Sequence, residues 1–166
     1  KKDSQDICFV ETAPGAYVEF IESYTGSPMK PGTFKDTNGN IIGEHRGIAR
    51  YTVGQRKGVN MSFGNGKPLY VIAKNAQEQT VITGENELLF SQEIKVKHFN
   101  MLYDRYNKEN LTAKHRYGQT DAPAELIFSE DGGAIIKFKT PQRAVTPGQF
   151  AVVYDGELVV GGGEIV

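Results

Sequence analysis

Hydrophobic positions follow a helical spacing only near the start of the chain. One helical face recurs at i, i+3, i+4 and i+7, formed by Tyr17, Phe20, Ile21 and Tyr24. Pro14 suits a first helical turn, and Gly26 suits the position after the end. The pattern predicts a short helix over about residues 14–24, which we expect to be the only substantial helix of the chain.

After this segment the pattern changes to short alternating runs separated by turn residues. The dipeptide Asn38-Gly39 predicts a tight hairpin between residues 33–35 and 41–43. Two further strands are expected on either side of the loop 75–79. From there on, alternation predicts six strands, at residues 94–102, 112–118, 124–129, 134–140, 149–154 and 157–160. Short strands at this spacing are typical of a barrel or a sandwich.

These elements predict a mainly β protein with one short helix. We place an extended polar segment at 1–11, a small central α+β domain at 12–75 and a β-barrel at 76–166. The second boundary is set at the polar loop near residues 73–77. With 166 residues and 39% apolar residues, the chain is long enough for one ordinary domain or two small ones.

Charge and cysteine content narrow the class of protein. The chain contains no run of about 18 apolar residues, so no membrane span is predicted. Its polar opening is unlike a signal peptide. One cysteine cannot form an internal disulfide, so a cytoplasmic protein is expected. The net charge is −1, but residues 44–67 have a local excess of bases. Such a patch either attracts phosphate or is an ordinary solvated face. Its bases are Arg46, Arg50, Arg56, Lys57 and Lys67.

Sequence motifs offer little support for a metal site or a nucleotide site. The three histidines are far apart in sequence, which argues against a zinc site, and no metal ligands are expected. His45 is interpreted as a structurally satisfied side chain. The glycines 161–163 precede no helix, so they do not form a dinucleotide-binding turn. The loop Gly54–Gly58 places Arg56 and Lys57 between two glycines, which suits either an RNA backbone or a charged β-turn.

The single cysteine, Cys8, is open to two interpretations. A lone cysteine often acts as a small inert apolar side chain. It can equally be a reactive thiol, and the neighbouring acidic and basic residues do not decide between the two.

Five separated motifs resemble the bacterial tRNA-specific 2-thiouridylases, in the order that the family has them. They cover nearly the whole chain: KKDSQDICF (1–9), GEHRGIARYTVGQRKG (43–58), PLYVIAKN (68–75), KHRYGQTDAPAEL (114–126) and FKTPQRAVTPGQFAVVYDGELVVGGGEIV (138–166). The resemblance implies a central domain followed by a barrel like the second domain of elongation factors. It also implies a missing N-terminal domain that binds ATP and has the first catalytic cysteine.

The resemblance implies a reaction as well. The full enzyme adenylates the C2 oxygen of the wobble uridine in certain tRNAs, and a persulfide on the cysteine matching Cys8 supplies the sulfur. The products are 2-thiouridine, AMP and a disulfide, since a thiolate is the nucleophile and sulfur passes by exchange. A cysteine desulfurase or a sulfur carrier is the expected donor. The chain alone is expected to be inactive, with no cofactor of its own.

The same resemblance assigns tRNA contacts to Arg116, Tyr117 and Gln149, to which the charge of the central loop adds Arg56 and Lys57. From the residues alone, the first three also suit a strand charge, a barrel aromatic and a turn residue. Two other functions stay open at this point: a non-enzymatic RNA-binding module, in which Cys8 is incidental, and a translation-factor-like barrel that binds protein only. No DNA or membrane partner is expected.

Overall fold

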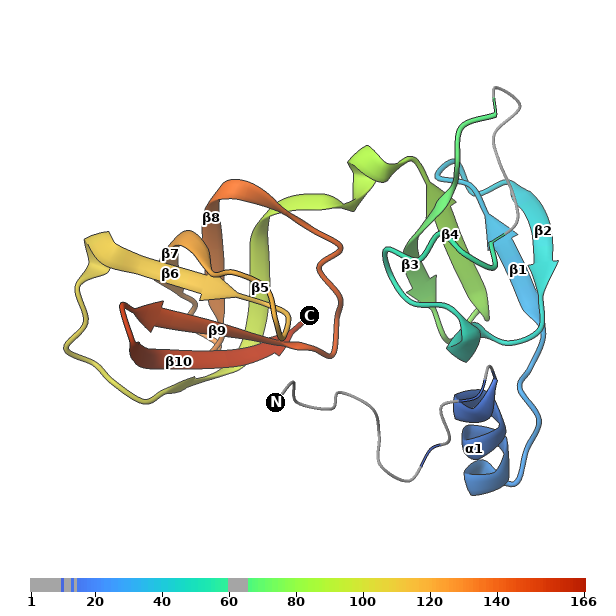
Figure 1. The fold of residues 1–166 in the computed structure, drawn as a ribbon, viewed down its shortest axis with the longest axis horizontal. Coiled ribbons are helices and arrows are strands. Elements are labelled where there is room, and N and C mark those ends of the chain that lie inside the picture. Colours follow the sequence, from blue (N-terminus) through green and yellow to red (C-terminus); the bar gives the residue numbers. More distant parts are fainter. Residues whose placement is uncertain (1–9, 11–12, 14, 60–65) are drawn as a thin grey trace. The chain divides into compact units, whose positions relative to one another are not determined.

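The computed structural model of the protein describes residues 10, 13, 15–59 and 66–166. It divides the chain into two compact units, residues 1–85 and 86–166 (Figure 1). The mainly β fold predicted from the sequence is confirmed, and α1 (Ala16–Thr25) is the one α-helix among the described residues. The segment 1–11, which contains Cys8, lies outside the described residues except for Val10.

The first unit is built on a four-stranded sheet with the order β2-β1-β4-β3. The predicted hairpin is present: β1 (Gly32–Lys35) pairs antiparallel with β2 (Ile41–His45). β3 (Tyr70–Asn75) and β4 (Thr80–Gly84) form a second hairpin, and β1 pairs parallel with β4. The buried core residues of this unit are Phe34, Tyr51, Val59, Leu69, Val71 and Val81.

The boundary between the units lies ten residues later than the sequence placed it. The loop 76–79 connects β3 to β4 inside one sheet, so it does not separate two domains. Since β4 pairs with β1 as well as with β3, residues 80–84 are central to the first sheet. A polar loop between two strands is thus the turn of a hairpin here, and the units divide after Glu85.

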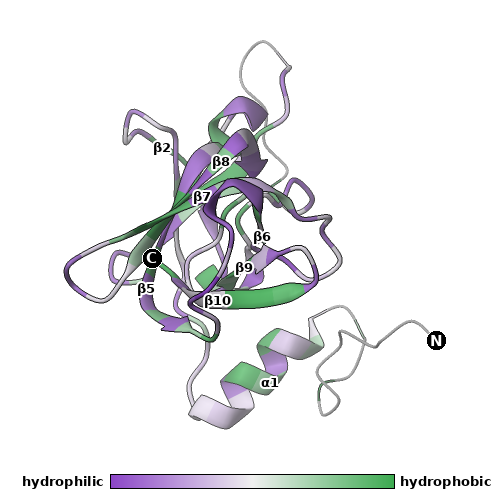
Figure 2. Ribbon diagram, turned by 90° about the vertical axis from the view of Figure 1, so that its left-hand side faces the viewer, coloured by the Kyte–Doolittle hydropathy of each residue, from purple (hydrophilic) through white to green (hydrophobic). Residues whose placement is uncertain are grey.

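The apolar face of α1 is more exposed than its periodicity suggests. Val18 is the buried residue of the helix, whereas Tyr17 and Tyr24 are 49% and 82% exposed. Phe20 stacks on Tyr24 with ring centroids 6.0 Å apart. Figure 2 shows apolar and polar positions alternating along the helix. The spacing therefore predicts the helix, but not the face that packs against the unit.

The second unit is a closed six-stranded barrel with the order β10-β5-β8-β7-β6-β9. All six strands that alternation predicts are present. Neighbouring strands are antiparallel, and the interior is filled by aliphatic side chains with Phe138. The strands are β5 (Phe90–Met101), β6 (Leu111–Lys114), β7 (Ala122–Phe128), β8 (Ala134–Arg143), β9 (Phe150–Asp155) and β10 (Leu158–Ile165).

Strand β6 is shorter than predicted. The sequence extends it to residue 118, but the strand ends at Lys114 and a turn occupies 115–118. A backbone bond from the Gln119 N–H to the Arg116 carbonyl closes this turn at 3.4 Å. Arg116 and Tyr117 therefore lie on a loop at one end of the barrel, and not on a strand.

Candidate functional site

The barrel brings three predicted residues to one end of the second unit. β6 and β9 are antiparallel with Lys114 opposite Val152, so the chain after Lys114 runs beside the chain before Val152. This places Arg116 and Tyr117 next to the turn that contains Gln149. Tyr117 is 71% exposed, Gln149 is exposed and Arg116 is half-buried. We call Arg116, Tyr117, Gln149 and the neighbouring Phe150 the barrel-end surface.

Hydrogen bonds fix the two loops of this surface to each other. The Arg116 guanidinium donates from Nη2 to the Ala144 carbonyl at 2.8 Å and to the Thr146 hydroxyl at 3.3 Å. The Gln119 amide donates to Gln142 Oε1 at 2.7 Å. Bonds from a charged donor are stronger than neutral ones, so Arg116 holds the turn 115–118 against the loop 144–149. Its Nε is buried and has no hydrogen-bond partner among the described protein atoms.

His115 lies beneath this surface and was not singled out from the sequence. It is 1% exposed and directly follows β6, continuing the alternation of the buried residues Leu111 and Ala113. Burial lowers the pKa of His115, and the positive charge of Arg116 lowers it further. Neither ring nitrogen has a hydrogen-bond partner among the described protein atoms. The inward alternation of Leu111 and Ala113 is the sequence signal that marks this side chain as buried.

In the first unit, the loop 52–58 presents Arg56 and Lys57. Gln55 braces this loop from inside: its Oε1 accepts from the Thr52 N–H at 2.9 Å, and its Nε2 donates to the Lys57 carbonyl at 2.8 Å. Gly54 and Gly58 have φ of 88° and 82°, a region that disfavours other residues. Both cationic side chains are exposed. The loop therefore turns, as its glycines predicted, and leaves two cations at the surface; the amide of Gln55 that braces it was not predicted.

The backbone of this loop is joined to the sheet. The Gly54 N–H donates to the Val71 carbonyl at 2.8 Å, and the Val71 N–H donates to the Gln55 carbonyl at 3.0 Å. Tyr51, directly before the loop, is buried and packs edge-on against Phe34 with centroids 5.0 Å apart. The loop thus continues the edge of the sheet next to β3, and its position is set by the core.

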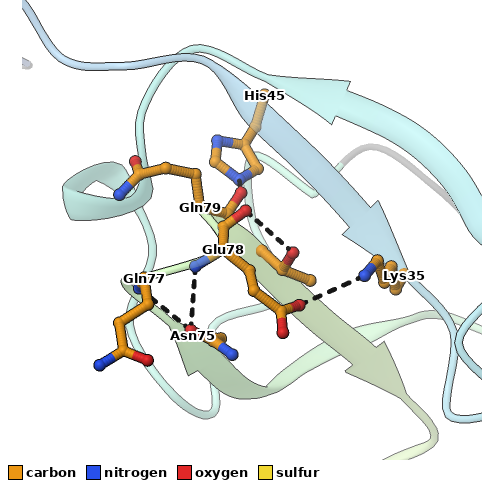
Figure 3. A network of polar contacts seen from close by, with 7 residues as sticks. Lys35, His45, Asn75, Gln77, Glu78 and Gln79 are labelled. Carbon is orange, nitrogen blue, oxygen red and sulfur yellow. Dashed lines mark hydrogen bonds and ion pairs between the residues drawn. The ribbon is translucent and has the colours of Figure 1, made fainter.

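His45 is a structural residue, as the sequence suggested, and it is 3% exposed (Figure 3). The Gly47 N–H donates to Nδ1 at 3.2 Å, so Nε2 has the proton and donates to the Gln79 carbonyl at 3.1 Å. Burial lowers the pKa of His45, which the bond to Gln79 only partly opposes. A Cβ on Gly32 would lie 1.8 Å from the Gln79 oxygen, so only glycine fits there. Much of the motif at residues 43–58 therefore supports the sheet.

The basic patch continues on both sides of this loop. Arg46 and Arg50 are exposed as well, and Arg50 Nε donates to the Arg46 carbonyl at 3.3 Å. None of Arg46, Arg50, Arg56 and Lys57 forms an ion pair with another described residue, whereas Lys67 pairs with Glu85 at 3.0 Å. Four of the five bases predicted as a patch therefore keep unneutralised charge within the described part of the chain.

The described residues also bear on a metal site and on a membrane span. They contain no group of three or more His, Cys, Asp or Glu side chains placed to hold a metal ion. No helix in the described part of the chain is long and apolar enough to cross a membrane. Cys8 lies outside the described residues, so its role stays a prediction.

Comparison with known families assigns each unit to a class of domain. Residues 18–85 match the tRNA methyl transferase PRC-barrel domain, and residues 91–165 match the aminomethyltransferase β-barrel domain. The first match ends at Glu85, where the structure divides the chain. The protein is thus a PRC-barrel domain followed by a closed β-barrel of a class found in tRNA-modifying enzymes.

Relatives of known function extend this match across both units. The chain is 47% identical to the tRNA-specific 2-thiouridylase MnmA of Acetivibrio thermocellus, 42% to that of Clostridium beijerinckii and 40% to that of Aquifex aeolicus. Each match covers 99% of the chain and 45% or 46% of the relative. The chain belongs to the tRNA-specific 2-thiouridylase family and corresponds to its C-terminal part. It spans about half the length of the curated relatives that it matches.

Proposed function

We propose that this chain forms the tRNA-holding and sulfur-delivering part of an enzyme that converts the wobble uridine of tRNA to 2-thiouridine. The observation that carries the proposal is the continuous match, at 40–47% identity, to relatives named for this activity. Two groups of exposed side chains support the RNA-binding part of this proposal. They are the barrel-end surface and the cationic loop 52–58.

The chemistry of each group fits a different part of RNA. Arg56 and Lys57 supply charge for phosphate oxygens, which positions a nucleic acid without reading its sequence. Tyr117 offers an exposed ring and Gln149 an exposed amide, which suit an unpaired base better than a helical stem. Arg116 joins the two loops through Nη2 and, as a half-buried cation at this end of the barrel, is a further candidate for a phosphate contact.

In this proposal Cys8 carries the persulfide. The sulfur comes from a cysteine desulfurase or a carrier protein, and ATP is bound by a part of the enzyme outside residues 1–166. The segment 1–11 supplies the thiol, and the sheet and the barrel that follow hold the substrate tRNA. Without the ATP-binding part we expect the chain to bind tRNA and not to thiolate it. A cytoplasmic location and a preference for tRNA over DNA belong to the same proposal.

The RNA-binding half is tested by filter binding of tRNA to the chain at several salt concentrations. The affinity falls with salt because phosphate contacts release counterions, with a slope that reports the number of contacts. Replacing both Arg56 and Lys57 with alanine should lower this slope by one to two contacts. Salt-independent binding, or none, contradicts the proposal and favours the protein-binding barrel.

A non-enzymatic RNA-binding module is the second candidate. It is favoured by one observation: the candidate groups that the structure describes are surface side chains suited to binding rather than to bond-making. The two functions differ in what they require of Cys8. If the chain acts in the enzyme, replacing this thiol abolishes thiolation and leaves the tRNA affinity intact. If it is a binding module, replacing the thiol leaves thiolation unchanged.

A further inference from the structure

Phe150 is a large exposed aromatic side chain at the barrel end that the sequence did not single out. It is the first residue of β9 and is 65% exposed, while Ala151 and Val153 point into the barrel and are fully buried. The alternation along β9 therefore directs Phe150 to the outside. A ring of this size contributes nothing to the barrel core from that position.

The pairing of strands places this ring beside Tyr117. Lys114 lies opposite Val152, and two residues further along each chain the turn 115–118 passes the start of β9. The bonds from Arg116 to Ala144 and Thr146 fix that turn to the loop leading into β9. Two exposed rings, 71% and 65% accessible, thus lie at one end of the barrel, with Gln149 directly before Phe150 in the sequence.

The charges around the two rings favour a polyanion. Lys114 extends over the Tyr154 ring at 4.7 Å from its centroid, and Arg116 is adjacent to Tyr117. The acid opposite Phe150 is Glu164, which is paired with Lys97 at 3.0 Å. Asp121 is the acid that faces Lys114. Arg116 is thus the cation next to Tyr117, Lys114 lies further along β9 beside Tyr154, and the acid opposite Phe150 is neutralised by Lys97.

We propose that Phe150 stacks on an unpaired base of the bound RNA, next to Tyr117. Aromatic rings interleaved with basic side chains are the arrangement with which proteins bind single-stranded nucleic acid, since every base offers a π-face. This inference rests on the proposed function and adds a contact residue to it. The competing occupant is a protein partner with an apolar surface, which would contact the same ring through apolar area and not through its π-face.

The chain contains no tryptophan, so Phe150→Trp creates a single fluorescent reporter at the site. Addition of tRNA should quench its emission, because a stacked base contacts the indole directly. A fully double-stranded RNA of equal length should quench it far less. Leu158→Trp is the matched control: Leu158 is 52% exposed and lies at the other end of the β9–β10 ladder. Equal quenching of both variants overturns the inference.

Affinity measurements separate stacking from apolar contact. Phe150→Ala should weaken tRNA binding about tenfold, the size expected for one stacked base. Phe150→Leu should weaken it nearly as much, because leucine keeps apolar area without a π-face. Equal urea midpoints for all three proteins confirm that the exposed position does not affect folding. Wild-type affinity in Phe150→Ala, or full rescue by leucine, refutes stacking. Failure of the unmodified chain to bind tRNA refutes the proposed function itself.

Discussion

Replacing Gln55 with alanine tests whether the loop 52–58 is a scaffold for Arg56 and Lys57. The side chain makes two short bonds within its own loop, to the Thr52 N–H at 2.9 Å and to the Lys57 carbonyl at 2.8 Å. A third contact, to the Arg50 carbonyl, is longer at 3.4 Å. No other described group within the loop makes three such bonds.

The cost follows from these contacts. A net contribution of about 0.5–1.5 kcal/mol for each of the two short bonds gives about 1–3 kcal/mol lost from the first unit, with little from the long contact. For a domain of this size the melting temperature falls on the order of 5–20 °C. The tRNA affinity should fall as well, since Arg56 and Lys57 are then no longer held in place before binding.

Circular dichroism during heating measures the stability of the first unit, and filter binding measures the affinity. Gln77→Ala is the control, because Gln77 is exposed and the described structure gives its side chain no hydrogen bond. If Gln55→Ala melts at the temperature of Gln77→Ala, the brace contributes nothing. If Gln55→Ala melts at a lower temperature but binds tRNA as well as the control, Gln55 stabilises the loop and the loop does not contact RNA.

Three further outcomes follow from the same structure. Arg56→Ala and Lys57→Ala should each lower the salt slope of tRNA binding by about one contact, and slopes equal to wild type would remove these residues from the interface. Burial lowers the folded-state pKa of both His45 and His115, so the unfolded chain binds protons more readily. Stability is therefore full above about pH 7 and falls as the pH drops below 6.5; a urea midpoint that is constant from pH 7.5 to 5.5 contradicts this. Gly32→Ala should abolish folding of the first unit or lower its stability by several kcal/mol, on the order of a large steric core defect, and a wild-type melting curve would show that the backbone yields there.

Most of the fold could be predicted from local sequence patterns. Alternation and turn residues predicted all six barrel strands, and Asn38-Gly39 predicted the first hairpin correctly. The boundary near residue 75 was misplaced because β4 pairs in parallel with β1, some 45 residues earlier in the chain, and so belongs to the first sheet. No local signal in residues 76–84 reports such a partner. The apolar face predicted for α1 is largely exposed for a similar reason: periodicity describes the helix, not what covers it.

The candidate site needed the three-dimensional structure in a different way. Arg116 and Gln149 are 33 positions apart, and only the pairing of β6 with β9 brings their loops together. The structural work of Gln55 is invisible in sequence, because a glutamine between glycines has the same appearance whether it braces a loop or faces solvent. Phe150 follows Gln149 directly, yet its exposure depends on the phase of β9 relative to the barrel interior.

The most direct test of the account is the formation of 2-thiouridine by the full-length protein after Cys8→Ser. Serine keeps the size of the side chain and cannot hold a persulfide sulfur. We predict that thiolation is lost while the affinity for tRNA equals that of wild type. Undiminished 2-thiouridine from the serine variant would contradict the account, and would leave the two units as an RNA-binding module whose thiol has no part in the chemistry.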